Sequence, residues 1–110
     1  MNVTVQSRGN VVIAYLFGEI DHHTSAEVRQ SIDEQILGTK PNHLIMDFKN
    51  VSFMDSSGIG LVMGRYRLIK SISPHISLEV RNVSLQTKKV MQLAGLGNIA
   101  IIKENENEKV

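Results

Sequence analysis

The stretch with the most chemical information is Asp55-Ser56-Ser57-Gly58-Ile59-Gly60. Asp and Ser are common at helix N-termini, and an apolar pattern of helical period follows directly. A hydroxyl at such a position lies beside free backbone N–H groups and the positive end of the helix dipole. Two interpretations stay open: a plain helix cap, or a hydroxyl placed to meet a ligand or a second protein.

The glycines of this stretch also allow either a purely structural role or a role in contact with another molecule. Gly58 and Gly60 fall in the first turn of the expected helix, where each costs about 1 kcal/mol relative to alanine. Glycine is used at that cost where another chain segment must come close to the backbone. The approaching segment could belong to the sheet beneath the helix or to a partner, and the spacing does not decide between them.

Enzymatic interpretations of these residues have little support. The serines do not lie in a Gly-x-Ser-x-Gly nucleophile elbow, and the glycines after them do not form a dinucleotide-binding fingerprint. A triad could be assembled from Ser56, His22 and Asp21, but nothing in the spacing predicts an oxyanion hole or a substrate pocket. The spacing of these residues therefore favours none of the enzymatic interpretations.

Metal and cofactor chemistry is not expected either. The chain has no cysteine, which removes thiolate ligands and thiolate nucleophiles. His22 and His23 are adjacent and would point apart in an extended segment, while His43 and His75 stand alone. We predict no metal and no cofactor.

Composition narrows the class of protein. The chain has 110 residues, the size of one domain, with 42% hydrophobic and 21% charged residues, as in folded globular proteins. Twelve basic and eleven acidic residues leave a formal charge of +1, which argues against a nucleic-acid partner. We see no signal-peptide pattern and no apolar run long enough to cross a bilayer, so we expect a cytoplasmic protein without membrane attachment. We expect a monomer, because no heptad pattern or long apolar edge favours association.

We call residues 55–60 the serine block. The strands and helices that must position it can be predicted from hydrophobic periodicity and turn signals. Alternating or continuous apolar residues predict strands, and apolar residues at helical spacing predict the helices between them. The expected order is strand 3–5, turn 7–10, strand 11–17, helix 24–37, strand 43–48, connection 49–54, helix 55–71, strand 76–80, a helix from 82 or 84 to 93, and a possible edge strand 99–102.

This order predicts an α/β fold with the sequence β-β-α-β-α-β-α and a possible last strand. A hairpin followed by right-handed crossovers gives a mixed sheet of four to five strands. The helices should lie mainly on one face of the sheet, because there are few of them.

Two finer expectations concern the helices. Thr24 and Glu27 have the spacing of a capping box at the start of the first helix. Helical periodicity predicts a buried face on that helix and a solvated face on the second. The buried face comprises Ala26, Val28, Ile32, Ile36 and Leu37, and the solvated face comprises Arg65, Arg67 and Lys70.

Three segments carry a family resemblance: Gly18-Glu19-Ile20-Asp21-His22-His23-Thr24, the block from Val51 to Gly60, and Gly64-Arg65-Tyr66. Together they resemble the STAS-domain anti-sigma factor antagonists, and in particular the members that act in sporulation. The segment Leu93-Ala94-Gly95-Leu96 is similar to the family's helix ending. The resemblance implies one STAS domain over residues 1–102. Residues 103–110 are polar, and we expect them to form a frayed C-terminal tail.

The resemblance implies a regulatory binding protein and not an enzyme. Family members bind an anti-sigma factor that is also a nucleotide-bound serine kinase, and so displace the sigma factor that it holds. The kinase phosphorylates the first serine after the aspartate, which is Ser56 here, and a serine phosphatase later restores the free hydroxyl. Asp21 is expected to face the same partner surface, with further contacts at His22, His23, Thr24, Met54, Asp55, Ser57, Gly58 and Gly60.

The chain departs from the family pattern at Ser84-Leu85-Gln86, which replaces a proline-containing helix start, and in its short charged C-terminus. Two alternatives to the regulator remain. One is a STAS module that senses a nucleotide or other ligand at the helix N-terminus. The other is a small hydrolase or phosphotransfer enzyme that uses Ser56 as its nucleophile.

Overall fold

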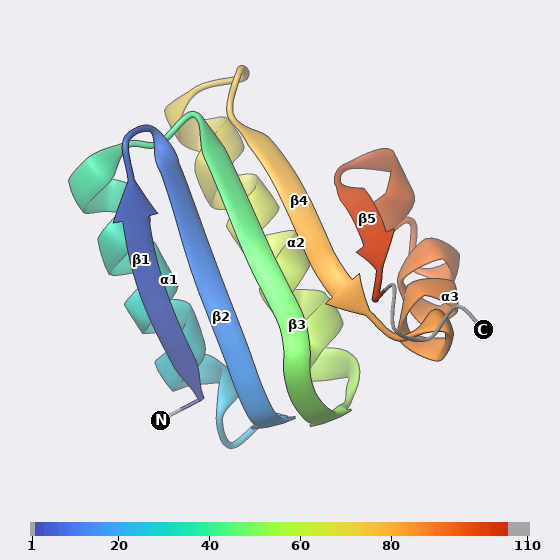
Figure 1. The fold of residues 1–110 in the computed structure, drawn as a ribbon. Coiled ribbons are helices and arrows are strands. Elements are labelled where there is room, and N and C mark those ends of the chain that lie inside the picture. The colour runs from blue at the N-terminus through green and yellow to red at the C-terminus, as the bar shows by residue number, and fades with distance from the viewer. Residues whose placement is uncertain (1, 106–110) are drawn as a thin grey trace.

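The computed structural model describes residues 2–105. The predicted order of elements is confirmed and includes the last strand (Figure 1). The elements are β1 (Val3–Arg8), β2 (Val11–Ile20), α1 (Ser25–Thr39), β3 (His43–Met54), α2 (Ser56–Ile72), β4 (Ser77–Val83), α3 (Leu85–Leu93), the 3-10 turn η1 (Leu96–Asn98) and β5 (Ile101–Glu104).

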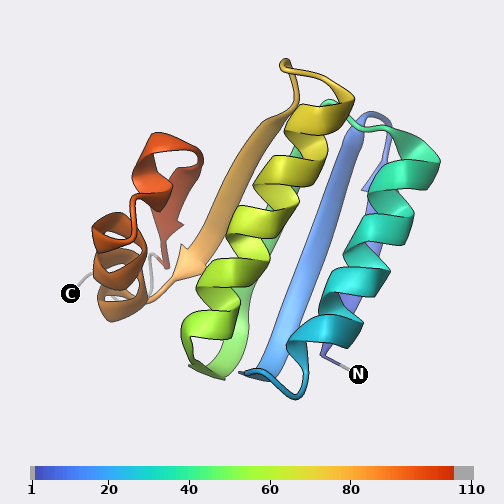
Figure 2. The ribbon, with the colours of Figure 1, turned by 180° about the vertical axis from the view of Figure 1, so that it is seen from behind.

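The strands form one five-stranded sheet in the order β1-β2-β3-β4-β5. β1 is antiparallel to β2, and the other neighbours are parallel, so the predicted mixed sheet is confirmed. Figure 2 shows α1 and α2 side by side on one face of the sheet, with α3 apart from them beside β5. The opposite face carries no helix among the described residues, as Figure 1 shows.

The core lies between the sheet and the pair α1 and α2. Side chains alternate along β2, so Val12, Ala14 and Leu16 point into the core while the residues between them point to the free face. α1 contributes Val28 and Ile32 to the same core, at the four-residue spacing that keeps side chains on one helix face. Burial of these apolar side chains holds the helix layer on the sheet.

The start of α1 corrects the predicted capping box. Thr24 occupies the N-cap position, but its hydroxyl makes no capping hydrogen bond. Instead Thr24 Oγ1 accepts from the backbone N–H of Asp21 at 3.0 Å and donates to the carbonyl of Glu19 at 2.9 Å. The Thr24 side chain therefore braces the loop before the helix and does not satisfy the helix itself.

The far end of α1 also differs from the prediction. The helix continues through Gly38 to Thr39, and Lys40 adopts the left-handed conformation that ends it, with φ of 47°. Leu37 is 55% exposed and Ala26 is exposed as well, so neither belongs to the buried face. The apolar stripe is narrower than periodicity alone predicted.

The segment expected to connect β3 to α2 is part of β3. β2 continues to Ile20 and offers a parallel partner, so residues 50–54 pair with it as far as Met54. The pairing shifts register on both sides of Gly18, whose φ is +73°. Irregularities of this kind locally bend and twist a strand. Beyond them the two strands stay paired as far as Ile20 and Met54, next to the serine block.

Arg65 lies in the core region and not on a solvated face, being 5% exposed. Its Nε is 2.7 Å from Oδ1 of Asp33 on α1, and Nη1 donates to the carbonyl of Leu61 at 3.3 Å. Desolvation raises the pKa of Asp33, opposed by the charge of Arg65, and desolvation likewise lowers the pKa of Arg65. The pair joins α1 to α2.

The C-terminal part is more structured than predicted. Of the two candidate caps for α3, Ser84 accepts from the backbone N–H of Thr87 at 3.1 Å, whereas Asn82 belongs to β4. Lys103 and Glu104, expected in the frayed tail, are paired in β5, and residues 106–110 of that tail lie outside the described residues. No helix in the described part has the length and apolarity to cross a membrane.

Candidate functional site

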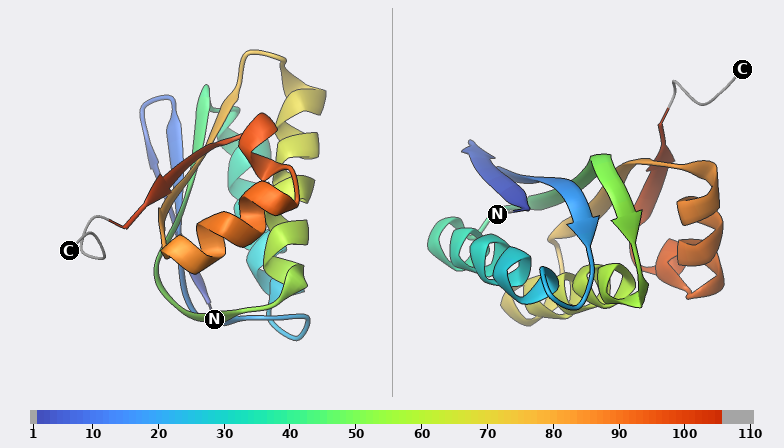
Figure 3. Two further views of the ribbon diagram at one scale, coloured as in Figure 1. Left: turned by 90° about the vertical axis from the view of Figure 1, so that its right-hand side faces the viewer. Right: turned by 90° about the horizontal axis from the view of Figure 1, so that it is seen from below.

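Two loops meet where β2 and β3 end at the same edge of the sheet. Ile20 pairs with Met54, and the backbone N–H of Asp55 donates to the carbonyl of Ile20 at 3.2 Å. The loop 21–24 leads from β2 into α1, and the serine block leads from β3 into α2. Figure 3 (right) looks onto this edge, with the starts of both helices next to the strand ends.

The cap of α2 is Asp55 and not a serine. Asp55 Oδ1 accepts from the backbone N–H of Ser57 at 2.8 Å, and the carbonyl of Asp55 accepts from the N–H of Gly58 at 3.0 Å. Ser56 is therefore the first helical residue, and its side chain is exposed. Within residues 2–105 the Ser56 hydroxyl makes no hydrogen bond, so it is free to meet another molecule.

Asp21 places a carboxylate at the same edge. Its Oδ1 accepts from the backbone N–H groups of His23 at 2.8 Å and Thr24 at 3.1 Å. The hydrogen bond from His23 is the main reason why the pKa of Asp21 lies below its ordinary value of 3.8. The carboxylate is thus ionised at neutral pH and fixed by its own loop.

The structure does not assemble the triad of Ser56, His22 and Asp21. The rings of His22 and His23 are exposed and contact each other edge to face, with centroids 4.4 Å apart. Across the described residues, neither ring is hydrogen-bonded to Ser56 or to the Asp21 carboxylate. No group of three His, Asp or Glu side chains positioned for a metal ion occurs in residues 2–105.

The glycines divide into two kinds. A Cβ on Gly58 would lie 2.2 Å from Cγ and Sδ of Met54, so a larger residue here would force the Met54 side chain to move. A Cβ on Gly60 or Gly64 would meet nothing within 4 Å. Both line an open groove between α1 and α2, next to Ser57, and the fold itself does not require them.

A second groove of about 560 Å³ lies on the other side of Ser56, between the end of β3 and α3. Phe53, Ile59 and Val90 contribute apolar surface to it, and Phe53 is 53% exposed. Sequence reasoning missed the α3 side of this groove. The available signal was Val90, an apolar residue beside Met91 on α3; Met91 is buried while Val90 is 47% exposed.

Comparisons with known proteins agree with this geometry. A model of the STAS domain family matches residues 2–109. The anti-sigma F factor antagonist of Paenibacillus polymyxa is 36% identical over 106 residues, which cover 96% of this chain and 89% of that protein. The anti-sigma F factor antagonist of Lysinibacillus sphaericus is 40% identical over 86 residues, covering 78% of this chain and 72% of that protein.

Two solved structures of a relative share the fold. The unphosphorylated anti-sigma factor antagonist SpoIIAA has a TM-score of 0.77 and 33% identity, covering 96% of this chain and 90% of that one. The Bacillus cell fate determinant SpoIIAA in its phosphorylated form has a TM-score of 0.72 and 33% identity, covering 96% and 94%. Because the family match spans nearly the whole chain and the architecture agrees, the chain belongs to the STAS domain family, as its sequence resemblance predicted.

Proposed function

We propose that this chain is an anti-sigma factor antagonist that releases a sporulation sigma factor by binding an anti-sigma factor with serine kinase activity. The proposal includes a switch: phosphorylation of Ser56 ends binding, and a serine phosphatase restores it. The observation that carries the proposal is the exposed Ser56 hydroxyl, left free because Asp55 caps α2. The relatives named as anti-sigma F factor antagonists, and the phosphorylated form of SpoIIAA, support it.

The switch works through charge at the interface. A phosphate on Ser56 adds about −1.5 to −2 charges and three acceptor oxygens. The free N–H groups and dipole at the start of α2 accommodate an anion, so the fold of the chain changes little. A partner that fits the neutral hydroxyl must instead bury this charge beside Asp55. A penalty of about 3–4 kcal/mol weakens binding several hundredfold.

The partner surface that we propose is centred on Ser56 and has three parts. The loop with Asp21 supplies a fixed negative charge, which suits a basic side chain of the partner. The groove with Phe53 and Val90 supplies apolar area. The exposed backbone at Gly60 allows close approach. His22, His23, Thr24, Met54, Asp55, Ser57 and Gly58 remain proposed contacts or supports of this surface.

The experiment that tests the proposal is mass spectrometry of the chain after incubation with its anti-sigma kinase and ATP. We expect one phosphate, located on Ser56, and none on Ser56→Ala. Ser57→Ala is the matched control, because it removes the neighbouring hydroxyl and leaves the Asp55 cap intact, since Asp55 accepts from the backbone of residue 57. Equal phosphorylation of Ser56→Ala and the wild type would overturn the assignment of the site.

A further inference from the structure

Asn82 has a backbone conformation that side-chain-bearing residues rarely adopt. Its φ is +60°, and the pairing of β4 with β5 shifts register between Val80 and Val83. Asparagine tolerates the left-handed region better than most residues, but the conformation still has to be held by its surroundings. Asn82 thus marks a bulge at the end of β4, two residues before the cap of α3.

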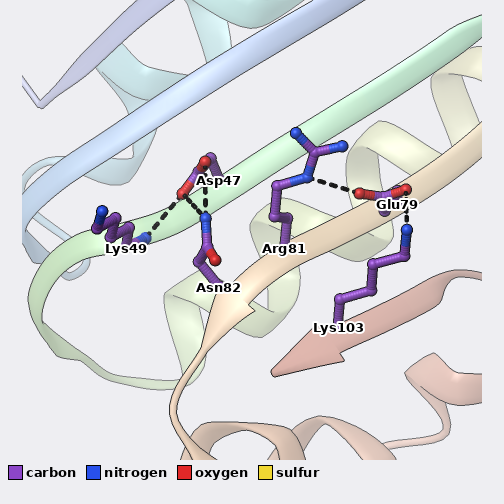
Figure 4. Close-up of polar contacts among 6 residues, drawn as sticks. All are labelled: Asp47, Lys49, Glu79, Arg81, Asn82 and Lys103. Atoms are coloured by element: carbon purple, nitrogen blue, oxygen red, sulfur yellow. Dashed lines mark hydrogen bonds and ion pairs between the residues drawn. The ribbon is translucent and has the colours of Figure 1, made fainter. Parts of the chain in front are cut away.

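Asp47 holds this bulge from the neighbouring strand. Asn82 Nδ2 donates to both carboxylate oxygens of Asp47, at 3.1 and 3.0 Å, and the backbone N–H of Lys49 donates to Oδ1 at 2.9 Å. Asp47 is 7% exposed, so these hydrogen bonds replace most of its hydration. Figure 4 shows the Asp47–Asn82 clamp separate from the ion pairs of Glu79 with Arg81 and Lys103.

Asn82 lines a small pocket that borders the groove with Ser56, because both are lined by Val51, Met54, Ser84 and Thr87. Val83 follows Asn82 and accepts from the backbone N–H of Asn105, and Ser84 then caps α3. Ser84 and Thr87 line the groove opposite Ser56. The main neighbours of α3 are η1 and β5, not α1 or α2, and Figure 3 (left) shows α3 crossing the edge of the fold. The corner at residues 82–84 is the direct connection from the sheet to α3, which also packs against η1 and β5.

We infer that Asp47 and Asn82 are positioning residues for the partner surface. By fixing the β4–α3 corner, they hold the α3 wall of the groove at the distance from Ser56 that the partner requires. This inference rests on the proposed function for its effect on binding. Its structural half, the placement of α3, can be measured without any partner.

Asn82→Gly tests the clamp with little backbone strain, because glycine adopts a φ of +60° freely while the amide is lost. We expect amide hydrogen exchange in residues 85–93 to become at least tenfold faster, with exchange in α2 unchanged. Affinity for the anti-sigma factor, measured by calorimetry, should fall about fivefold or more. Lys103→Gln is the control, because it breaks an exposed ion pair on the same sheet face, and neither quantity should change.

A charge-neutral swap provides the rescue. Asn82→Asp alone sets two carboxylates against each other and should give the largest loss of affinity and the fastest exchange. Adding Asp47→Asn restores an amide–carboxylate pair in the reverse direction, and aspartate also tolerates the left-handed region. The double variant should therefore recover most of both quantities, which mere loss of packing at either site would not allow.

The outcomes distinguish a failure of the positioning role of Asp47 and Asn82 from a failure of the proposed function. Faster exchange in α3 with unchanged affinity would overturn the inference, as would unchanged exchange in Asn82→Gly. Lower affinity without faster exchange would mean that Asn82 touches the partner itself, which also overturns a positioning role. If the wild type binds no anti-sigma factor, the proposed function fails, and the exchange measurements still decide whether the clamp places α3.

Discussion

The backbone N–H of Asp55 donates to the carbonyl of Ile20 at 3.2 Å, and this hydrogen bond joins the two loops of the site. Asp21 follows Ile20 and Ser56 follows Asp55, so two segments far apart in the sequence present their side chains at one edge of the sheet. A phosphate on Ser56 would enter a surface that already carries two carboxylates. The proposed partner would therefore meet the summed charge of both loops.

Replacement of Ser56 by aspartate should weaken the complex with the anti-sigma factor. Ser56→Asp adds one negative charge at the start of α2, about half that of phosphate, so we expect at least a tenfold loss of affinity in calorimetry. Ser56→Ala should bind within about twofold of the wild type. The loss for Ser56→Asp should change little as salt is added, because a charge buried in the interface is screened much less than an exposed one.

A control at the other end of α2 makes this result specific. Ser71 is exposed and lies in the last turn of the helix, away from the site. Ser71→Asp adds the same charge to the same helix and should leave affinity unchanged. If Ser56→Asp bound as tightly as the wild type, or if Ser71→Asp were equally weakened, interface charge would not be the switch.

Gly58 and Gly60 should respond in opposite ways to alanine. Gly58→Ala places a methyl group against Met54 and should lower the free energy of unfolding, whereas Gly60→Ala enters open space and should raise it by about 1 kcal/mol. Urea denaturation measures both. We also expect Gly60→Ala to reduce affinity for the anti-sigma factor although the fold is more stable.

Each part of this prediction can fail separately. Met54→Ala combined with Gly58→Ala should recover part of the lost stability, since it removes the atoms in conflict. A Gly60→Ala variant that is more stable and binds normally would show that no partner approaches the helix backbone there.

Asp55 should stabilise α2 through its side-chain oxygen. Asp55→Ala removes the acceptor for the backbone N–H of Ser57 and should lower the free energy of unfolding by about 1 kcal/mol. Asp55→Asn keeps a side-chain oxygen and should retain most of that stability. Equal losses for the two variants in urea denaturation would show that the charge, and not the capping oxygen, provides the stabilisation.

The fold was predictable because its determinants are local. Apolar alternation, turn residues and the cap residue Asp55 each act within a few residues, so the order of elements and the position of the serine block were predicted correctly. The length of β3 was not predictable in this way. Residues 50–54 form a strand because β2 pairs with them, and a local sequence pattern does not show which segment will lie beside it.

The errors in the site have the same origin. Thr24 has the residue type and spacing of a cap, yet its hydroxyl bonds within the loop that Asp21 organises. The helical spacing of Arg65 predicted a place on the solvated face of α2, yet its side chain is buried and forms an ion pair with Asp33 of α1. In both cases the periodicity or spacing of one helix was used, whereas the observed partners lie outside that helix.

Removal of Asp33 alone should lower the free energy of unfolding more than removal of both Asp33 and Arg65. Asp33→Ala leaves the 5% exposed guanidinium of Arg65 without its counter-charge, and we expect about 3 kcal/mol less free energy of unfolding. The double variant Asp33→Ala with Arg65→Met should recover much of this loss, because it removes the uncompensated buried charge. Additive losses in urea denaturation would contradict this coupling.

Asp21 should stabilise its loop only where it is ionised. Its pKa in the folded protein lies below the ordinary 3.8, because His23 and Thr24 donate backbone hydrogen bonds to the carboxylate. The unfolded chain therefore binds this proton more readily than the folded protein does. The contribution of Asp21 is fully present above about pH 3.8 and is lost as the pH falls through the lower folded pKa.

Two measurements check this sign. In an NMR titration, the side-chain carboxyl of Asp21 should titrate below 3.8, and that of Asp33, whose pKa burial raises, should titrate above it. The difference in free energy of unfolding between the wild type and Asp21→Asn should shrink as the pH falls below about 3.8. A difference independent of pH, or an Asp21 that titrates at or above 3.8, would mean that the His23 and Thr24 hydrogen bonds do not fix this carboxylate, and the proposed partner would meet a mobile charge at this edge.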